Sequence, residues 1–177
     1  HHNFPSQTVD ILQKQGIDIR LEKLIATTGW TTDELAAALC EARPDFTYDW
    51  VTLLIGVNNQ YRGRSSEEYR TQFYGLLCQA ILYAGSRPER VIVLSIPDWG
   101  LTPFNTERDQ SQTSDEIDAY NRINRAITGA MGCHYIDITA STREHATDSA
   151  YLAEDKLHYS GKEYRIWAEK VAAILHA

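Results

Sequence analysis

The most informative residues are an aspartate and a histidine near the C-terminus, Asp155 and His158, in the sequence Asp-Lys-Leu-His. This spacing lets a single turn hold the carboxylate against one imidazole nitrogen, so that the other nitrogen can take a proton from a hydroxyl group. The alternative is an aspartate-capped loop with an incidental surface histidine. Because the pair stands just before the expected last helix, the pattern favours a general base with its orienting acid.

Two further residues could stabilise negative charge. Asn58 follows the apolar run of residues 51–55 in the sequence Gly56-Val-Asn58, and its amide can donate a hydrogen bond to a developing oxyanion. Gly29 precedes a helix that Thr31 is expected to cap, where a backbone N–H lies near a positive helix end. Each also has a plainer interpretation, because asparagine and glycine are common turn residues.

The nucleophile that would complete such a site is not found in the chain. Ser6 lies in a helix start, Ser95 within a predicted strand, and Ser160 is better explained as a helix cap. None stands in the strand-to-helix elbow that exposes a catalytic serine. His134, His145 and His176 are interpreted as solvated or structural.

Apolar periodicity predicts a helix from about Pro5 to Gly16, and Ser/Thr-x-x-Glu capping boxes predict four further helix starts. These boxes run from Thr31 to Glu34, Ser65 to Glu68, Thr113 to Glu116 and Ser160 to Glu163. Strands are predicted over residues 17–26, 51–55, 91–96 and 135–138. The alternation of helices and strands indicates an α/β fold, a parallel sheet with helices on both faces, in one domain over residues 1–177.

The candidate residues follow the expected carboxyl ends of the strands, which is where ligands bind in such sheets. Trp30 follows the first strand and Trp99 the third, so both are candidates to line a substrate cleft, with the long loop 98–112 as a wall. The chain opens with a helix, whereas such a sheet opens with a strand. We therefore expect a further βα unit before His1; His1 and His2 are left out of functional reasoning.

Composition excludes several classes of function. The 177 residues carry a net charge of −7 without a basic cluster, which argues against nucleic-acid binding, and Arg62 and Arg64 are interpreted as solvated. The longest apolar run, residues 51–55, is too short to span a membrane. The sequence contains no phosphate-binding glycine motif and no metal-like cluster, so no cofactor and no metal are expected.

The three cysteines, Cys40, Cys78 and Cys133, form no CxxC pair. They are predicted to be buried thiols, which favours a reducing compartment such as the cytoplasm. Exported enzymes without disulfides are common, however, so the compartment stays open.

The order and spacing of these motifs resemble the SGNH (GDSL-type) hydrolase family of esterases and lipases. Gly29 matches the family's second block, Gly56 and Asn58 its third, and Asp155 with His158 its last. The resemblance implies a three-layer α/β/α, flavodoxin-like fold. Asn59 stands where the family usually has aspartate, and the Gly-Asp-Ser block that carries the nucleophilic serine is absent.

The resemblance implies a metal-free, serine-dependent hydrolase of carboxylic esters, acting on a small-molecule substrate. His158 and Asp155 would be catalytic, Gly29 and Asn58 would form the oxyanion hole, and the serine is expected upstream of His1. The chain as written is then predicted to be inactive. A carbohydrate O-acetyl esterase, in which Trp30 and Trp99 stack on sugars, and a non-catalytic binding module that has lost its serine stay open. The sequence predicts neither acyl and alcohol specificity nor oligomeric state.

Overall fold

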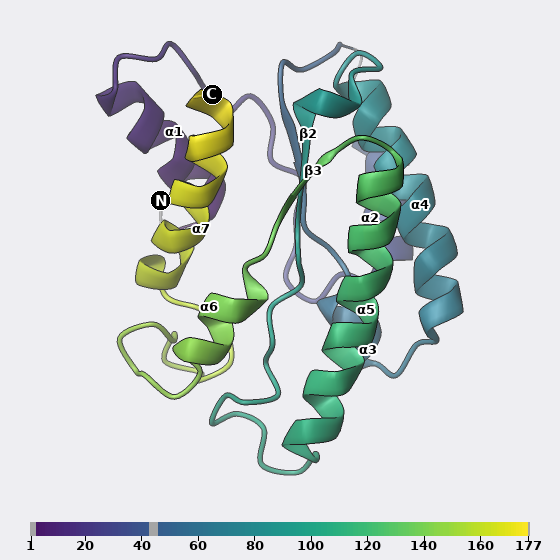
Figure 1. The fold of residues 1–177 in the computed structure, drawn as a ribbon, viewed down its shortest axis with the longest axis vertical. Helices are drawn as coiled ribbons and strands as arrows, with labels where there is room; N and C mark the ends of the chain where they lie inside the picture. Colours follow the sequence, from purple (N-terminus) through teal and green to yellow (C-terminus); the bar gives the residue numbers. More distant parts are fainter. Residues whose placement is uncertain (1–2, 43–45, 177) are drawn as a thin grey trace. The chain divides into compact units, whose positions relative to one another are not determined.

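The computed structural model describes residues 3–42 and 46–176, so His1 and His2 lie outside the described residues. These residues cluster into two compact units (Figure 1). The first unit contains the described residues up to Leu24 together with residues 98–114 and 138–176. The second unit contains residues 25–97 and 115–137.

The second unit is built on a parallel sheet of three strands in the order β1-β2-β3, counted over the described residues. The strands are β1 (Val51–Leu53), β2 (Val91–Leu94) and β3 (His134–Ile136). Val51 pairs with Val91 and Ile92 pairs with His134. All residues of the central strand are buried, as expected for a continuous apolar run covered on both faces. The three predicted strands are thus confirmed, although each is shorter than its apolar run.

Helices α2 (Thr32–Ala42), α3 (Val57–Tyr61), α4 (Ser66–Tyr83) and α5 (Gln110–Ala130) belong wholly or mainly to this unit, together with the short 3-10 helix η1 (Pro88–Arg90). Helix α4 packs against both α2 and β1. Tyr69 of α4 stacks on Tyr120 of α5 with ring centroids 4.5 Å apart, and its hydroxyl donates to the carbonyl of Ile55. The end of β1 is therefore held by a buried aromatic pair.

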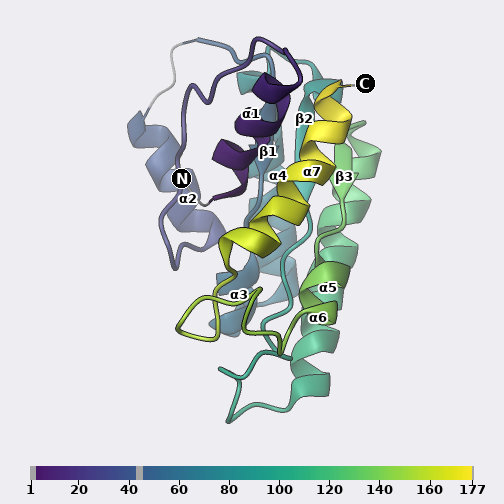
Figure 2. The ribbon, with the colours of Figure 1, turned by 90° about the vertical axis from the view of Figure 1, so that its left-hand side faces the viewer.

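The first unit is held together by a pair of helices. Helix α1 (Phe4–Lys14) and helix α7 (Gly161–His176) lie side by side (Figure 2), and Ile11, Leu12, Ala168 and Ala172 form the buried core between them. Helix α6 (Thr139–Glu144) precedes the loop that leads to α7. Asn3 caps α1 by accepting a hydrogen bond from the backbone N–H of Ser6, and proline occupies the first turn.

The strand predicted over residues 17–26 is wrong, because this segment forms no strand. Its alternating apolar residues have a different partner: Ile17 and Ile19 pack against the core between α1 and α7. The side chain of Gln13 donates to the carbonyl of Ile19 at 2.8 Å. Packing of an extended segment on a helix pair produces the same alternation as a half-buried strand.

Three of the four predicted helix starts are confirmed, because α2, α4 and α7 begin directly after Thr31, Ser65 and Ser160. Glu34 accepts from the N–H of Thr31 at 2.8 Å, and Ser65 accepts from the N–H of Glu68 at 3.1 Å. The box from Thr113 to Glu116 is wrong, because α5 begins at Gln110 and the side chain of Asp109 accepts from the N–H of Gln112. In the box at Ser160, the serine accepts from Lys162, whereas the glutamate Glu163 is buried in the core.

The prediction of buried cysteines is also corrected, since Cys40 is exposed and Cys78 and Cys133 are partly buried. Burial raises the pKa of the Cys133 thiol to about 11. Across the described ranges, no helix combines the length and the apolarity needed to cross a bilayer.

Candidate active site

The pair Asp155 and His158 forms a closed turn in the first unit. Nδ1 of His158 lies 2.6 Å from Oδ2 of Asp155, and the other carboxylate oxygen accepts the backbone N–H groups of Leu157 and His158 at 3.0 and 2.9 Å. Lys156 adopts a left-handed conformation with φ of 59°, which turns these N–H groups back toward the carboxylate. Because Nδ1 is bonded to the acid, Nε2 is the nitrogen that remains to exchange a proton with a substrate or nucleophile.

The turn is closed by backbone contacts at its base. The N–H of Ala153 donates to the carbonyl of His158 at 2.8 Å, and Leu152 and Tyr159 form an antiparallel bridge. The hydroxyl of buried Tyr159 donates to the carbonyl of Asp98 at 3.0 Å. The pair therefore stands on a fixed base rather than on a free loop.

The contacts of Asp155 also stabilise its ionised form. The hydrogen bond from His158, supported by those from the two backbone N–H groups, lowers the pKa of Asp155 to about 2. The carboxylate is thus ionised at neutral pH, which is the state that orients and stabilises an imidazole acting as a general base. Both side chains are about half exposed.

In the second unit, Gly56 fixes the start of α3 and with it the position of Asn58. Its φ of 129° is accessible to glycine, and a Cβ at this position would approach the ring of Tyr69 to 2.6 Å. Glycine therefore satisfies both a backbone and a packing requirement. Asn58 follows in the first turn of the helix.

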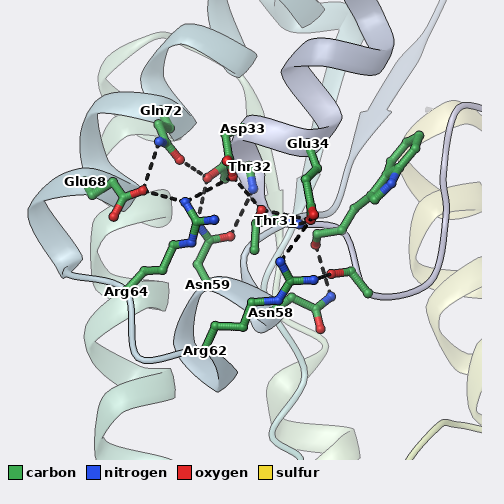
Figure 3. Close-up of polar contacts among 12 residues, drawn as sticks. Thr31, Thr32, Asp33, Glu34, Asn58, Asn59, Arg62, Arg64, Glu68 and Gln72 are labelled. Atoms are coloured by element: carbon green, nitrogen blue, oxygen red, sulfur yellow. Dashed lines mark hydrogen bonds and ion pairs between the residues drawn. The ribbon is translucent and has the colours of Figure 1, made fainter.

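Asn58 reaches across to the segment that carries Gly29. Its Nδ2 donates to the carbonyl oxygen of Trp30 at 3.0 Å (Figure 3). An amide carries two N–H groups, so this bond uses one and orients the other. The structure therefore brings Gly29, Trp30 and Asn58 together in the second unit, as it brings Asp155 and His158 together in the first.

Gly29 itself adopts a left-handed conformation with φ of 92°. Its carbonyl oxygen accepts a hydrogen bond from Nη2 of Arg62 at 2.7 Å. Arg62 also lies 3.3 Å from Glu34, whose other carboxylate oxygen accepts from Thr31. Arg62 was interpreted as solvated from the sequence, and its side chain is indeed 43% exposed, but the interpretation missed its bond to the backbone of Gly29.

Asn59, which stands where the resembling family usually has aspartate, is fully buried. Its Oδ1 accepts from the backbone N–H of Thr32 at 3.1 Å, and its Nδ2 donates to the hydroxyl of the same residue at 2.7 Å. That hydroxyl in turn donates to Gln72 of α4 (Figure 3). Asn59 thus ties the start of α2 to α3, and the amide rather than a carboxylate suits this chain of bonds.

The two tryptophans named as cleft candidates differ in exposure. Trp30 is partly buried, whereas Trp99 is only 4% exposed. The ring of Trp99 contacts Phe104 and lies under the guanidinium of Arg108, with distances of 6.4 Å between ring centroids and 5.3 Å from Cζ to centroid. Trp30 consequently has the larger surface for contact with a ligand.

Sequence reasoning missed a second imidazole and carboxylate pair. Nδ1 of His145 lies 2.8 Å from Oε2 of the buried Glu163, and its ring stacks on Tyr151 with centroids 3.7 Å apart. The other oxygen of Glu163 accepts from Ser141 at 2.6 Å and from Trp167 at 2.9 Å. Within residues 3–42 and 46–176, no three His, Cys, Asp or Glu side chains are grouped so that they could hold a metal ion.

Comparison with known proteins decides the family. The profile of the GDSL-like lipase/acylhydrolase family matches residues 1–166. The chain belongs to this family. The resemblance seen in the motifs is thereby confirmed, and family membership supports ester hydrolysis as the class of reaction.

Solved structures of similar fold include acetylxylan esterases and a lipase/acylhydrolase. An acetylxylan esterase from Geobacillus stearothermophilus superposes with a TM-score of 0.75 at 21% identity, covering 99% of this chain and 81% of the other. A second acetyl xylan esterase gives 0.71 at 16% identity, covering 97% and 90%. A lipase/acylhydrolase from Enterococcus faecalis gives 0.60 at 19% identity, covering 97% and 82%.

At these identities the similarity establishes the fold, and the predicted α/β class is confirmed. A search of curated proteins found no match.

Proposed function

We propose that the intact protein is a serine-dependent hydrolase of carboxylic esters that uses His158 as general base and Asp155 as its orienting acid. The observation that carries the proposal is the 2.6 Å contact between Nδ1 of His158 and the ionised carboxylate of Asp155. It leaves Nε2 of the imidazole for proton transfer, as serine hydrolysis requires. The nucleophilic serine is proposed to precede the residues printed here, in the family's Gly-Asp-Ser block.

In the proposed reaction the serine hydroxyl attacks the acyl carbonyl carbon while Nε2 of His158 takes the hydroxyl proton. The C–O bond to the alcohol then breaks, and His158 returns the proton to the leaving oxygen. Water attacks the acyl-enzyme by the same route and releases the acid. Asp155 stays ionised throughout and stabilises the imidazolium.

The oxyanion of each tetrahedral intermediate is proposed to accept the second N–H of the Asn58 amide and the backbone N–H of Gly29. Support comes from the bond between Asn58 and the carbonyl of Trp30, which orients the amide beside the glycine segment. Donors of this kind act on the transition state more than on the bound ester.

The test uses the intact protein and p-nitrophenyl acetate. Asn58→Ala is expected to lower kcat by about 10²–10³-fold with little change in KM, because an oxyanion donor acts in the transition state. His158→Ala is expected to abolish measurable turnover, whereas His176→Ala, which removes an exposed histidine bonded to Gln15, should leave it unchanged. Unchanged turnover in Asn58→Ala would reject the assigned role.

The chain as printed is proposed to be inactive by this route and not to be labelled by a fluorophosphonate probe, which reacts with activated serines. Labelling of this chain would contradict the proposal. If the natural coding sequence upstream of His1 contains no serine in a Gly-Asp-Ser block, the hydrolase proposal is rejected in favour of a non-catalytic binding module. A panel of p-nitrophenyl esters and acetylated xylan separates a general esterase from a carbohydrate O-acetyl esterase.

A further inference from the structure

We propose that Arg62 is a positioning residue for the oxyanion hole, which holds the Gly29 segment in the conformation that aims its backbone N–H at the substrate. The inference rests on the proposed function, because it assigns Arg62 a part in the oxyanion hole proposed there. All the contacts that carry it lie within the second unit.

The guanidinium of Arg62 is bonded at two points. Nη2 donates to the carbonyl oxygen of Gly29 at 2.7 Å, and Nη1 lies 3.3 Å from Glu34. The planar fork of arginine makes both contacts at once, which the single ammonium of a lysine matches poorly. The contact with the backbone distinguishes Arg62 from an ordinary surface ion pair, which contributes little by itself.

Gly29 needs such a restraint. With φ of 92° it lies in a region that glycine enters readily, but glycine also leaves it readily, because no Cβ limits its torsions. Any rotation at this residue turns its N–H. The bond from Arg62 holds the peptide plane that follows Gly29. The N–H of Gly29 lies in the plane before it, so only the φ and ψ torsions of Gly29 then set where this N–H points.

The next peptide plane, between Trp30 and Thr31, is held at both ends. The carbonyl of Trp30 accepts from Asn58, and the N–H of Thr31 donates to Glu34 at 2.8 Å. Glu34 therefore links the guanidinium of Arg62 to the start of α2. The result is a continuous set of side-chain restraints on the backbone from Gly29 to Thr31.

Arg64 offers a matched comparison two residues along the chain. It lies 2.7 Å from Glu68 and 3.3 Å from Asp33, so its guanidinium pairs with carboxylates of α4 and α2, much as Arg62 pairs with Glu34. Over the part of the chain that the structure describes, its guanidinium bonds to these carboxylates and not to the backbone of residues 29–31. Removal of Arg64 therefore reports the loss of a surface cation without loss of the restraint.

The experiment measures kcat and KM of the intact protein for p-nitrophenyl acetate in Arg62→Ala, Arg62→Lys, Arg64→Ala and Asn58→Ala. Arg62→Ala is expected to lower kcat by about 10–100-fold, the range for a misplaced catalytic group, with KM changed less than about threefold. Arg62→Lys should recover part of this loss. Arg64→Ala should keep the kcat of the unmodified enzyme. Arg62→Met, which keeps the length of the side chain, replaces the alanine variant if that variant does not fold.

The outcomes separate the inference from the function on which it rests. A kcat of Arg62→Ala within twofold of the unmodified enzyme, with Asn58→Ala impaired, overturns the positioning role and leaves the proposed function standing. An equal loss in Arg62→Ala and Arg64→Ala also overturns it, because charge removal alone then explains the effect. Full activity of Asn58→Ala rejects the oxyanion hole assigned under the proposed function, and the inference with it.

Discussion

The imidazole of His145 and the carboxylate of Glu163 meet at 2.8 Å, with the glutamate fully buried in the first unit. The same carboxylate accepts from Ser141 and Trp167, so three donors from separate positions in the chain end on one side chain. A buried acceptor that satisfies several donors contributes most through what its removal leaves unpaired.

Replacement of this glutamate therefore tests a structural centre that is separate from the catalytic proposal. Glu163→Ala is expected to lower the free energy of unfolding by about 2–4 kcal/mol, since it leaves buried donors unpaired and opens a cavity. Glu163→Gln should cost less, because the amide oxygen can keep Ser141 and Trp167 while His145 adopts its other tautomer.

Urea unfolding followed by tryptophan fluorescence measures both. Glu169→Ala, on the same helix and in an exposed pair with Arg165, is the control and should change stability by less than about 0.5 kcal/mol. Equal losses in the alanine variants at 163 and 169 would contradict the prediction.

Gly56 supports a second prediction. Gly56→Ala forces a side chain into a left-handed backbone position and against the ring of Tyr69, so a loss of about 2 kcal/mol or more is expected. Gly75→Ala is the matched control, because Gly75 is an exposed position of helix α4 with open space around it. This control should stabilise the protein by about 0.5–1 kcal/mol. Thermal unfolding measures the change in stability of both variants. A stabilising Gly56→Ala would contradict the prediction, because it would show that the ring of Tyr69 can move to admit a Cβ.

Asn59→Asp restores the residue that the family usually has, and two effects oppose each other. A carboxylate near the start of α2 gains about 0.3–1 kcal/mol from the helix dipole. It can no longer donate to the hydroxyl of Thr32, which must then turn away from Gln72, and an unsatisfied buried polar group costs about 1–3 kcal/mol.

The second effect is larger, so Asn59→Asp is expected to destabilise the protein by about 1 kcal/mol in urea unfolding. In Asn59→Asp combined with Gln72→Leu, which removes the acceptor left unpaired, the penalty of the aspartate should shrink. A more stable Asn59→Asp single variant would show that the dipole prevails.

The low pKa of Asp155 predicts a pH dependence of stability. The folded state favours the ionised form, so the stabilisation is complete above the ordinary value of 3.8 and is lost as the pH falls through about 2. Because the pair is half exposed, the effect is modest. Asp155→Asn should lower the melting temperature by about 1–4 °C at pH 6, and the difference should close toward pH 2.

Asp18→Asn, at an exposed position of the same unit, is the control for the loss of a surface carboxylate. A difference between Asp155→Asn and the unmodified protein that stays constant from pH 6 to pH 2 would exclude the carboxylate as its source.

Features with local signals were predictable from the sequence. Residues 91–94 became the central strand because each of their side chains is apolar, and Ser65 with Glu68 marked the start of α4 because a cap acts over three residues. The pairing of Asp155 with His158 was predictable for the same reason. Local spacing alone determined these contacts.

Features that depend on distant partners were not predictable. Glu163 has the spacing of a capping glutamate from Ser160, yet it binds Ser141 and His145, which lie far back in the chain. Arg62 donates to the carbonyl oxygen of Gly29. Because every residue type has the same backbone acceptor, no pattern of side chains in the sequence predicts this bond. The strand wrongly predicted over residues 17–26 has the same cause, because Ile17 and Ile19 pack on a core that includes residues of the distant helix α7.

The bond between Asn58 and Trp30 also fixes which end of the amide faces which way. The carbonyl of Trp30 only accepts hydrogen bonds, so the nitrogen of Asn58 must face it, and a flipped amide would bring two oxygens together at about the same separation. The side chain has one permitted orientation before any ligand arrives. An anion that approaches its second N–H meets a dipole that is already aligned and needs no rearrangement.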